Sequence, residues 1–283
     1  MQEFYKQLEA LWDDGRFTCV GLDTSLNKIP PCLINEHGAT SMAVLQFNKA
    51  IIDATIDSAC AFKPNLKRYE HSETLELALK QTIQYIKIVA PHIPVILDSK
   101  SGDIGSSNDG AVAAAFNRFG ADAATINPLF GKEAYEPFLN QTDKGIVVLV
   151  KTSNEGSKEF QDLVLEDGRL FYQYVAYRIA HHWNDNKNIA VVVGATYPEE
   201  LAKVREIIGD DMPILIPGIG AQGGDLVAAV RAGINSRGTG IVINSARDII
   251  YASDGADFAK DAGRAAKKLN DQIKAIIASL LPF

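Results

Sequence analysis

An acidic and a basic side chain stand two residues apart at the end of one apolar run, at Asp98 and Lys100. Residues two apart on a β-strand project from the same face. If that face lines a partly dry site, the adjacent carboxylate and ammonium can stabilise developing charge or transfer a proton. Lys63 ends another apolar run and extends the pair to an alternating charge array. The alternative is an ion pair at a loop mouth, with Lys63 solvated beside it.

A second group of residues has the composition of a phosphate site. Residues 217–225 include four glycines and end where a helix is expected to begin. Unobstructed backbone N–H groups at a helix start can bind phosphate, although glycine-rich turns are also common after strands. Arg247 adds a guanidinium that can hold phosphate oxygens bidentately. Asp23, at another strand end, either accepts hydrogen bonds from ribose hydroxyls or caps the following turn.

Eight short apolar runs position these residues, and longer stretches with helical spacing of apolar residues separate them. The absence of strict polar alternation predicts strands buried on both faces of a parallel sheet. The expected strands span 17–23, 59–64, 93–100, 121–128, 145–153, 189–196, 213–220 and 238–245. Eight such units predict a TIM (β/α)8 barrel, whose active site lies at the C-terminal strand ends and whose last two strands often supply a phosphate site. A doubly wound open sheet is the alternative, but the sequence has no GxGxxG motif.

The helical pattern is clearest at 72–90 and at 198–209, where Pro198 stands near the start and Gly209 at the end. The first dozen residues and 255–279 have amphipathic patterns and are expected to pack outside the barrel. Neither a linker nor a low-complexity tract interrupts the order. We therefore expect one barrel domain over 1–283, with N-terminal and C-terminal outer helices.

Composition excludes several functions. Lys and Arg total 28 against 35 acidic residues, so the net charge is −7 and the pI about 5.3, which argues against nucleic acid as a partner. No apolar run approaches the roughly 18 residues of a membrane span, and the N-terminus is too polar for a signal peptide.

Three scattered cysteines suit a cytoplasmic protein, with Cys19 and Cys60 expected to be buried. His181 and His182 lack a carboxylate at metal-ligand spacing, and no HExxH or Walker pattern is present, so no metal or cofactor is expected.

The segment DSKSGDIG (98–105) resembles the DxKxxDI signature of orotidine 5'-monophosphate decarboxylases. The similarity extends over nearly the whole chain, and the ordered blocks look like the longer, bacterial-type branch. These blocks are FKPNLKRYE (62–70), GADAATINPLFG (120–131), VLVKTSNEGSKEFQDL (148–163), VVGATYPEEL (192–201), IPGIGAQGGD (216–225) and INSARDIIYA (243–252).

This resemblance implies a cofactor-free decarboxylation of orotidine 5'-monophosphate (OMP) to uridine 5'-monophosphate (UMP), the last step of de novo UMP synthesis. Lys63, Asp98, Lys100 and Asp103 would form the family's charged network, with Lys100 as proton donor to C6 of the pyrimidine. Asp103 would be donated across a subunit interface, so the working unit would be a homodimer with shared active sites.

The same resemblance implies the substrate contacts. Asp23 and Ser107 would contact the ribose, and Ser153 would hydrogen-bond the pyrimidine. Gln222 and Arg247 would bind the 5'-phosphate, with the loop around Gln222 closing over it.

Two positions depart from the family pattern. Ser101 replaces a larger residue, often Arg, and Glu155 stands where Pro is usual. Neither removes a network residue. The closest alternative is a sugar-phosphate enzyme such as a hexulose-phosphate synthase, which shares the DxK strand end but binds Mg²⁺ and carries an acid near the position of Lys63. A second alternative is a catalytically idle barrel that binds phosphorylated metabolites, which should show a broken charge array.

Overall fold

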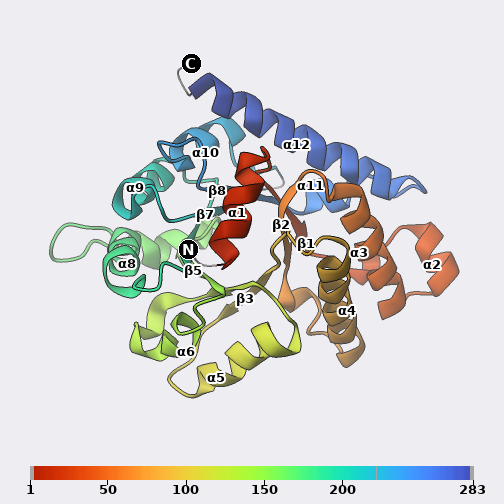
Figure 1. Cartoon of the computed structure of the whole chain (residues 1–283), viewed down its shortest axis with the longest axis horizontal. Coiled ribbons are helices and arrows are strands. Elements are labelled where there is room, and N and C mark those ends of the chain that lie inside the picture. Colours follow the sequence, from red (N-terminus) through yellow and green to blue (C-terminus); the bar gives the residue numbers. More distant parts are fainter. Residues whose placement is uncertain (1–2, 221, 281–283) are drawn as a thin grey trace.

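The computed structural model describes residues 3–220 and 222–280. Eight parallel strands alternate with helices and curl into a barrel (Figure 1), which confirms the TIM barrel expected from the sequence. The sheet order is β2-β1-β8-β7-β6-β5-β4-β3. The strands are β1 (Thr18–Leu22), β2 (Ala59–Pro64), β3 (Ile96–Ser101), β4 (Ala123–Ile126), β5 (Gly145–Lys151), β6 (Ile189–Val193), β7 (Ile214–Pro217) and β8 (Ile241–Ser245).

The barrel closes between β2 and β3, the two ends of the sheet order. These strands meet through two isolated bridges, Phe62 with Val95 and Asn65 with Asp98. The N–H of Phe62 donates to the carbonyl of Pro94 at 3.1 Å. The closure is therefore made by isolated bridges, whereas the other neighbouring strands pair as ladders.

Most strands are shorter than the apolar runs that predicted them, because the buried run continues past the last paired residue. All residues of β1, β2, β6 and β8 are buried, as expected for strands covered on both faces. The run expected over 213–220 forms a strand only over Ile214–Pro217, since the chain then enters the glycine-rich turn. The order of the strands was predicted correctly; β2 has the predicted bounds, β8 ends at the predicted residue, β3 ends one residue later than predicted, and the other five strands end earlier.

The helices that cover the barrel follow local sequence signals. The hydroxyl of Ser72 caps α4 by accepting from the N–H of Leu75 at 3.3 Å. Helix α9 has Pro198 at its first turn and ends at Gly209, whose φ is +71°. Among the described residues, no helix has the length and apolar character needed to cross a membrane. The helices are α1 (Glu3–Asp13), α2 (Pro31–His37), α3 (Ser41–Thr55), α4 (Glu73–Val89), α5 (Ser107–Val112), α6 (Glu136–Leu139), α7 (Lys158–Gln161), α8 (Phe171–Arg178), α9 (Pro198–Ile208), α10 (Leu226–Gly233), α11 (Arg247–Ile250) and α12 (Phe258–Leu280).

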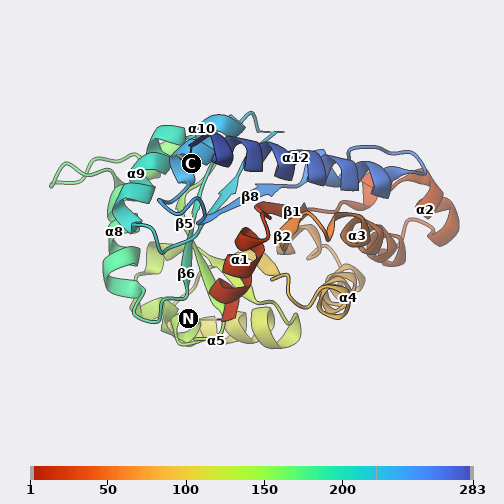
Figure 2. The same cartoon turned by 45° about the horizontal axis from the view of Figure 1, so that its top comes forward.

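Helix α1 lies across the N-terminal end of the barrel (Figure 1). The hydroxyl of Tyr5 donates to the carbonyl of Ile189, and the indole N–H of Trp12 donates to that of Ile241 at 2.9 Å. Both carbonyls belong to the first residues of strands, so α1 closes the end opposite the C-terminal strand ends. The long helix α12 packs along the outside against α3, α10 and α11 (Figure 2).

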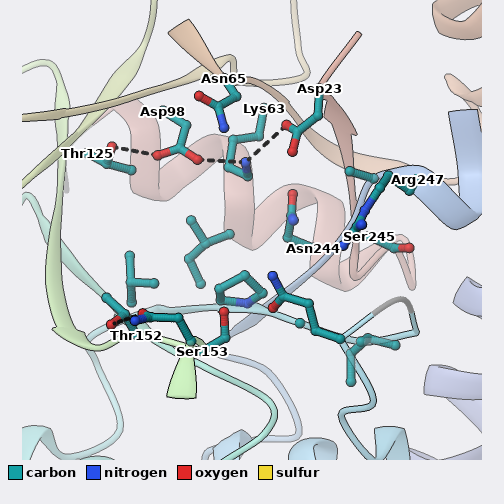
Figure 3. Close-up of a pocket in the computed structure, with 18 of the residues that line it drawn as sticks. Asp23, Lys63, Asn65, Asp98, Thr125, Thr152, Ser153, Asn244, Ser245 and Arg247 are labelled. Atoms are coloured by element: carbon teal, nitrogen blue, oxygen red, sulfur yellow. Dashed lines mark hydrogen bonds and ion pairs between the residues drawn. The ribbon is translucent and has the colours of Figure 1, made fainter. Parts of the chain in front are cut away.

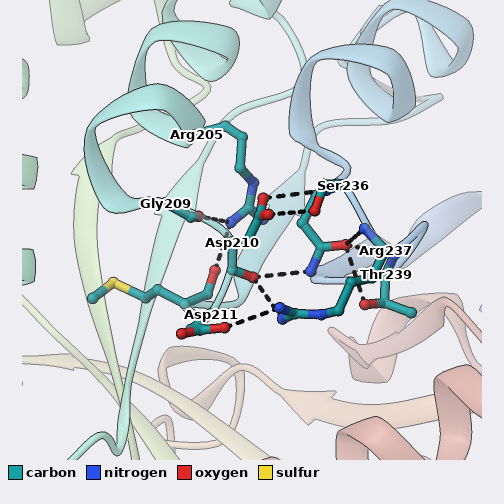
Figure 4. Close-up of polar contacts among 9 residues, drawn as sticks. Arg205, Gly209, Asp210, Asp211, Ser236, Arg237 and Thr239 are labelled. Atoms are coloured by element: carbon teal, nitrogen blue, oxygen red, sulfur yellow. Dashed lines mark hydrogen bonds and ion pairs between the residues drawn. The ribbon is translucent and has the colours of Figure 1, made fainter.

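A buried arginine organises the loops at the N-terminal end of the barrel (Figure 4). Burial lowers the pKa of Arg205 to about 10. Nearby, Arg237 contacts the carboxylate of Asp211 and the carbonyl of Asp210, both at 3.0 Å. The Arg205 guanidinium donates at 2.7–2.8 Å to the backbone carbonyls of Gly209, Met212, Gly233 and Gly240. The contacts to Gly209 and Gly233 satisfy carbonyls at the ends of α9 and α10, and those to Met212 and Gly240 hold the loops before β7 and β8.

Candidate active site

A cavity of about 350 Å³ opens at the C-terminal ends of the strands. Every strand, or a residue close beyond it, contributes to the lining. Figure 3 shows Asp23, Lys63, Asp98 and Thr125 along one wall of this pocket, with Ser153 opposite and Arg247 at a third side. This is the location at which TIM barrels carry their active sites.

The charge array expected from the sequence is present. One carboxylate oxygen of Asp98 accepts from the ammonium of Lys63 at 3.0 Å, and the other accepts from Lys100 at 2.7 Å. The hydroxyl of Thr125 donates to Asp98 at 2.9 Å, and the nearest oxygen of Asp23 is 3.9 Å from the Lys63 ammonium. The side chain of Lys63 is 5% exposed and that of Lys100 is 47% exposed. Lys63 is therefore a buried partner, whereas Lys100 reaches into the open pocket.

Neighbouring charges, rather than burial, decide the protonation of this array. Burial alone would lower the pKa of Lys63, but the carboxylates of Asp98 and Asp23 outweigh it and hold the pKa above its usual value. Burial alone would raise the pKa of Asp98, but Lys63 and Lys100 outweigh it and hold the pKa well below its usual value. The site therefore keeps a buried ammonium and a buried carboxylate at neutral pH.

The backbone at Lys100 is unusual. Its φ is +49°, in the left-handed region that lysine rarely occupies. The backbone N–H of Lys100 donates to the hydroxyl of Thr125 at 2.8 Å, and this hydroxyl in turn donates to Asp98. Thr125 on β4 thus holds both the strained backbone and the carboxylate, so it positions Lys100 relative to Asp98.

Ser153 follows β5 and lines the pocket. Its position depends on Gly194, where an added Cβ would lie 2.6 Å from the Cα of Ser153. The preceding Lys151 is ion-paired with Asp162 and is fully buried. The N–H of Thr152 donates to the side-chain oxygen of Gln161 at 2.9 Å. Gln161 at the end of α7 and Asp162 just after it therefore hold the end of β5 in place.

Gln222 and Arg247 line the same pocket. The Gln222 side chain folds over Gly218, whose φ is +103°; an added Cβ there would lie 2.9 Å from the Gln222 oxygen and 3.3 Å from the Cβ of Ser153. Gly218 thus allows the side chains of Gln222 and Ser153 to approach each other.

Two of the backbone amides at the start of α10, where the sequence predicted a phosphate cradle, are occupied by a side chain. The carboxylate of Asp225 accepts from the N–H groups of Val227 and Ala228, at 2.8 and 3.1 Å, and so occupies the amides that a phosphate would need. These two amides therefore already have a partner, and the side chains of Gln222 and Arg247 line the pocket together with Gly218 and Ile219 of the glycine-rich stretch.

Asp103 and Ser107 lie outside the pocket lining of their own chain. Both are exposed, and the Asp103 carboxylate accepts from the N–H of Ile104 at 2.7 Å. The buried Asn108 holds this loop by donating to the carbonyls of Asp103 and Ala134, at 2.8 and 2.6 Å. The loop is therefore anchored, but it presents Asp103 to solvent.

Other expectations can be compared directly. His181 and His182 are exposed and lie against Tyr177, as a surface position predicts. Cys19 and Cys60 are buried, as expected. Among residues 3–220 and 222–280, no three His, Cys, Asp or Glu side chains group as a metal site would require.

The sequence interpretation missed polar residues that line the pocket without belonging to a charge pattern. Their common feature is a position at or just beyond a strand end, and that was the available signal. They are Asn65, Thr125, Asn244 and Ser245.

Comparisons with known proteins agree with this geometry. Residues 18–262 match the model of the orotidine 5'-phosphate decarboxylase / HUMPS family. A protein named orotidine 5'-phosphate decarboxylase from Ralstonia pickettii (strain 12J) is 48% identical over 271 residues, covering 95% of this chain and 97% of that protein. A protein of the same name from Cellvibrio japonicus (strain Ueda107) is 46% identical over the same length and the same shares.

Solved structures give the same result. The OMP decarboxylase of Leishmania donovani superposes with a TM-score of 0.84 and 34% identity, covering 98% of this chain and 99% of that chain. The UMP synthase of the same organism gives a TM-score of 0.86 and 36% identity over 98% of this chain, which spans 57% of that chain. The chain therefore belongs to the orotidine 5'-phosphate decarboxylase / HUMPS family.

Proposed function

We propose that this protein converts OMP to UMP and CO2, the last step of de novo UMP synthesis, without a metal or cofactor. The observation that carries the proposal is the buried Lys63–Asp98–Lys100 array in the pocket of a member of this family. It also favours decarboxylation over a Mg²⁺-dependent sugar-phosphate reaction, because the ammonium of Lys63, 3.0 Å from Asp98, holds the place that a cation beside that carboxylate would take.

The chemical step separates the substrate carboxylate from C6. The C–C bond breaks, CO2 leaves, and the electron pair stays on C6. The Lys100 ammonium stabilises this charge and then gives C6 its proton, becoming a neutral amine that recovers a proton from water. Asp98 keeps Lys100 charged and oriented, and its repulsion of the substrate carboxylate is relieved when CO2 departs.

The remaining residues bind the nucleotide in this proposal. Asp23 and Ser107 contact the ribose, Ser153 contacts the pyrimidine, and Gln222 and Arg247 bind the 5'-phosphate. The phosphate lies far from C6, so its binding energy can close the loop around Gln222 and exclude water without taking part in the chemistry.

We also propose a homodimer in which Asp103 and Ser107 act on the partner's pocket. Exposed apolar side chains, here called the rim patch, include Ile104 in the loop that carries them and Phe130 next to Gly102 of the same loop, and large exposed apolar groups mark interfaces. Within the patch, Leu129, Phe160 and Leu163 share a cleft of about 400 Å³. The rim patch consists of Ile104, Leu129, Phe130, Phe160, Leu163 and Val164, each more than half exposed. A monomer at micromolar concentration in sedimentation equilibrium would contradict the dimer.

The decisive experiment is the turnover of OMP by purified protein in excess EDTA, followed by the loss of substrate absorbance. Rapid conversion by the wild type, and none by Lys100→Ala, is the expected result. No conversion by folded dimer would overturn the proposal, and a repeat with Mg²⁺ and pentose or hexulose phosphates would identify the sugar-phosphate alternative.

A further inference from the structure

Asn244 on β8 lines the active-site pocket with a side chain that makes no hydrogen bond within the described chain. Only 7% of the residue is exposed, and its amide oxygen is buried without a partner. A buried polar atom in this state costs free energy on the order of a lost hydrogen bond. Figure 3 shows the amide pointing from β8 toward Lys63 and Asp23. An unsatisfied amide oxygen at this place is unfavourable for folding alone, which indicates that a ligand group donates a hydrogen bond to it.

The neighbouring strand leaves room for this amide. Cys19 of β1 pairs with Asn244 of β8, and Gly21 lies two residues further along β1. A Cβ added to Gly21 would lie 3.2 Å from the amide oxygen of Asn244 and 2.6 Å from the Cβ of Ala246. A side chain at position 21 would therefore crowd the amide.

A second acceptor without a hydrogen bond lies on the same side of the pocket. One carboxylate oxygen of Asp23 is buried and has no hydrogen-bond partner, although it is 3.9 Å from the Lys63 ammonium. Among the described pocket-lining residues, Asp23 and Asn244 are the two that carry such an oxygen. The pocket thus offers two acceptors that lack donors.

The nucleotide has few donors to give. The phosphate, carboxylate and carbonyl oxygens of OMP accept hydrogen bonds, whereas the donors are the ring N3–H and the two ribose hydroxyls. In the proposed binding mode the ring lies at Ser153, across the pocket from Asp23. The two vicinal hydroxyls are therefore the donors that match the two acceptors.

We infer that Asn244 is a specificity-determining residue that accepts a hydrogen bond from one ribose hydroxyl, while Asp23 accepts from the other. The inference rests on the proposed function, because it assigns the sugar of that nucleotide. The inference also predicts the stability of the ligand-free protein. An asparagine that hydrogen-bonds within the fold stabilises it, whereas an amide that is satisfied only by a ligand does not. Replacing Asn244 should therefore leave the ligand-free protein at least as stable.

The test compares wild type, Asn244→Leu and Asn244→Ala with three competitive inhibitors: UMP, 2'-deoxy-UMP and 3'-deoxy-UMP. The wild type should bind UMP more tightly than either deoxy analogue. For both variants, the preference over one of the two analogues should fall on the order of tenfold, the effect of losing one hydrogen bond. The melting temperature of ligand-free Asn244→Leu should equal or exceed that of the wild type. Asn244→Ala keeps the test informative if the larger leucine prevents folding.

Ser245→Ala is the matched control, because Ser245 is adjacent on β8 and lines the same pocket. This variant should retain both preferences. Unchanged preferences in the Asn244 variants, or an equal loss in Ser245→Ala, would overturn the inference. Failure of the proposed function is a separate result, since the wild type would then neither decarboxylate OMP nor bind UMP.

Discussion

Lys151 at the end of β5 and Asp162 just beyond α7 form an ion pair in which the lysine side chain has no solvent exposure. The ammonium also lies 4.6 Å from the ring centre of Tyr197. Because removing one partner leaves an uncompensated buried charge, Asp162→Ala should lower the free energy of unfolding by about 3–5 kcal/mol. Denaturant titration measures this change.

Asp167→Ala is the control for that prediction. Asp167 lies in the same loop and pairs with Arg169 at the surface, so its removal should have little effect. Equal stability of the Asp162 and Asp167 variants would show that the buried pair does not hold the loop.

The pH dependence of stability should report the charge state of Asp98. Its pKa is held below the usual value of 3.8, so the native carboxylate stabilises the fold above that pH and loses this contribution as the pH falls toward the native pKa. Asp98→Asn should therefore be less stable than the wild type between about pH 5 and 9, by about 3 kcal/mol or more. The difference should shrink below pH 3.8. A difference that stays constant down to pH 2 would contradict the depressed pKa.

Arg247→Ala should weaken substrate binding more than catalysis. A guanidinium that holds phosphate contributes charge-assisted hydrogen bonds, so KM should rise between about 10- and 100-fold, with a smaller change in kcat. Steady-state kinetics separates the two constants. Arg237→Ala, at the opposite end of the barrel, should leave both unchanged, and an unaltered KM in Arg247→Ala would remove Arg247 from the phosphate site.

Mixed dimers should show that Asp103 acts on the partner's pocket. Lys100→Ala and Asp103→Ala should each be nearly inactive as pure dimers with an intact fold. In a hybrid of the two, one site combines native Lys100 with native Asp103 from the other subunit. Random mixing should therefore restore about a quarter of the wild-type activity. If both residues acted within one chain, mixing would restore none.

Much of the site followed from the order of the sequence. Apolar runs predicted the strands. The rule that barrel sites lie at C-terminal strand ends then predicted that Lys63 and Asp98 belong to one site. The spacing of Asp98 and Lys100 predicted their contact correctly. It did not predict the left-handed backbone at Lys100, because that conformation depends on the hydroxyl of Thr125 from the next strand.

Two other features of the site could not be predicted from the spacing of residues along the chain. The glycine-rich turn indicated free amides at the start of α10, but Asp225 caps that helix. Asp103 belongs to the DxKxxDI motif, yet within one chain its side chain faces solvent. Its proposed role needs a second subunit, which local patterns along one chain cannot position.

The closure of the barrel has an evolutionary consequence. Two isolated bridges join β2 to β3, and the Lys63–Asp98 ion pair spans this junction. The same two side chains therefore serve the proposed chemistry and the junction that closes the barrel. A substitution at either position that suits a new reaction therefore also removes a contact between β2 and β3, which ties the divergence of the chemistry to the stability of the barrel.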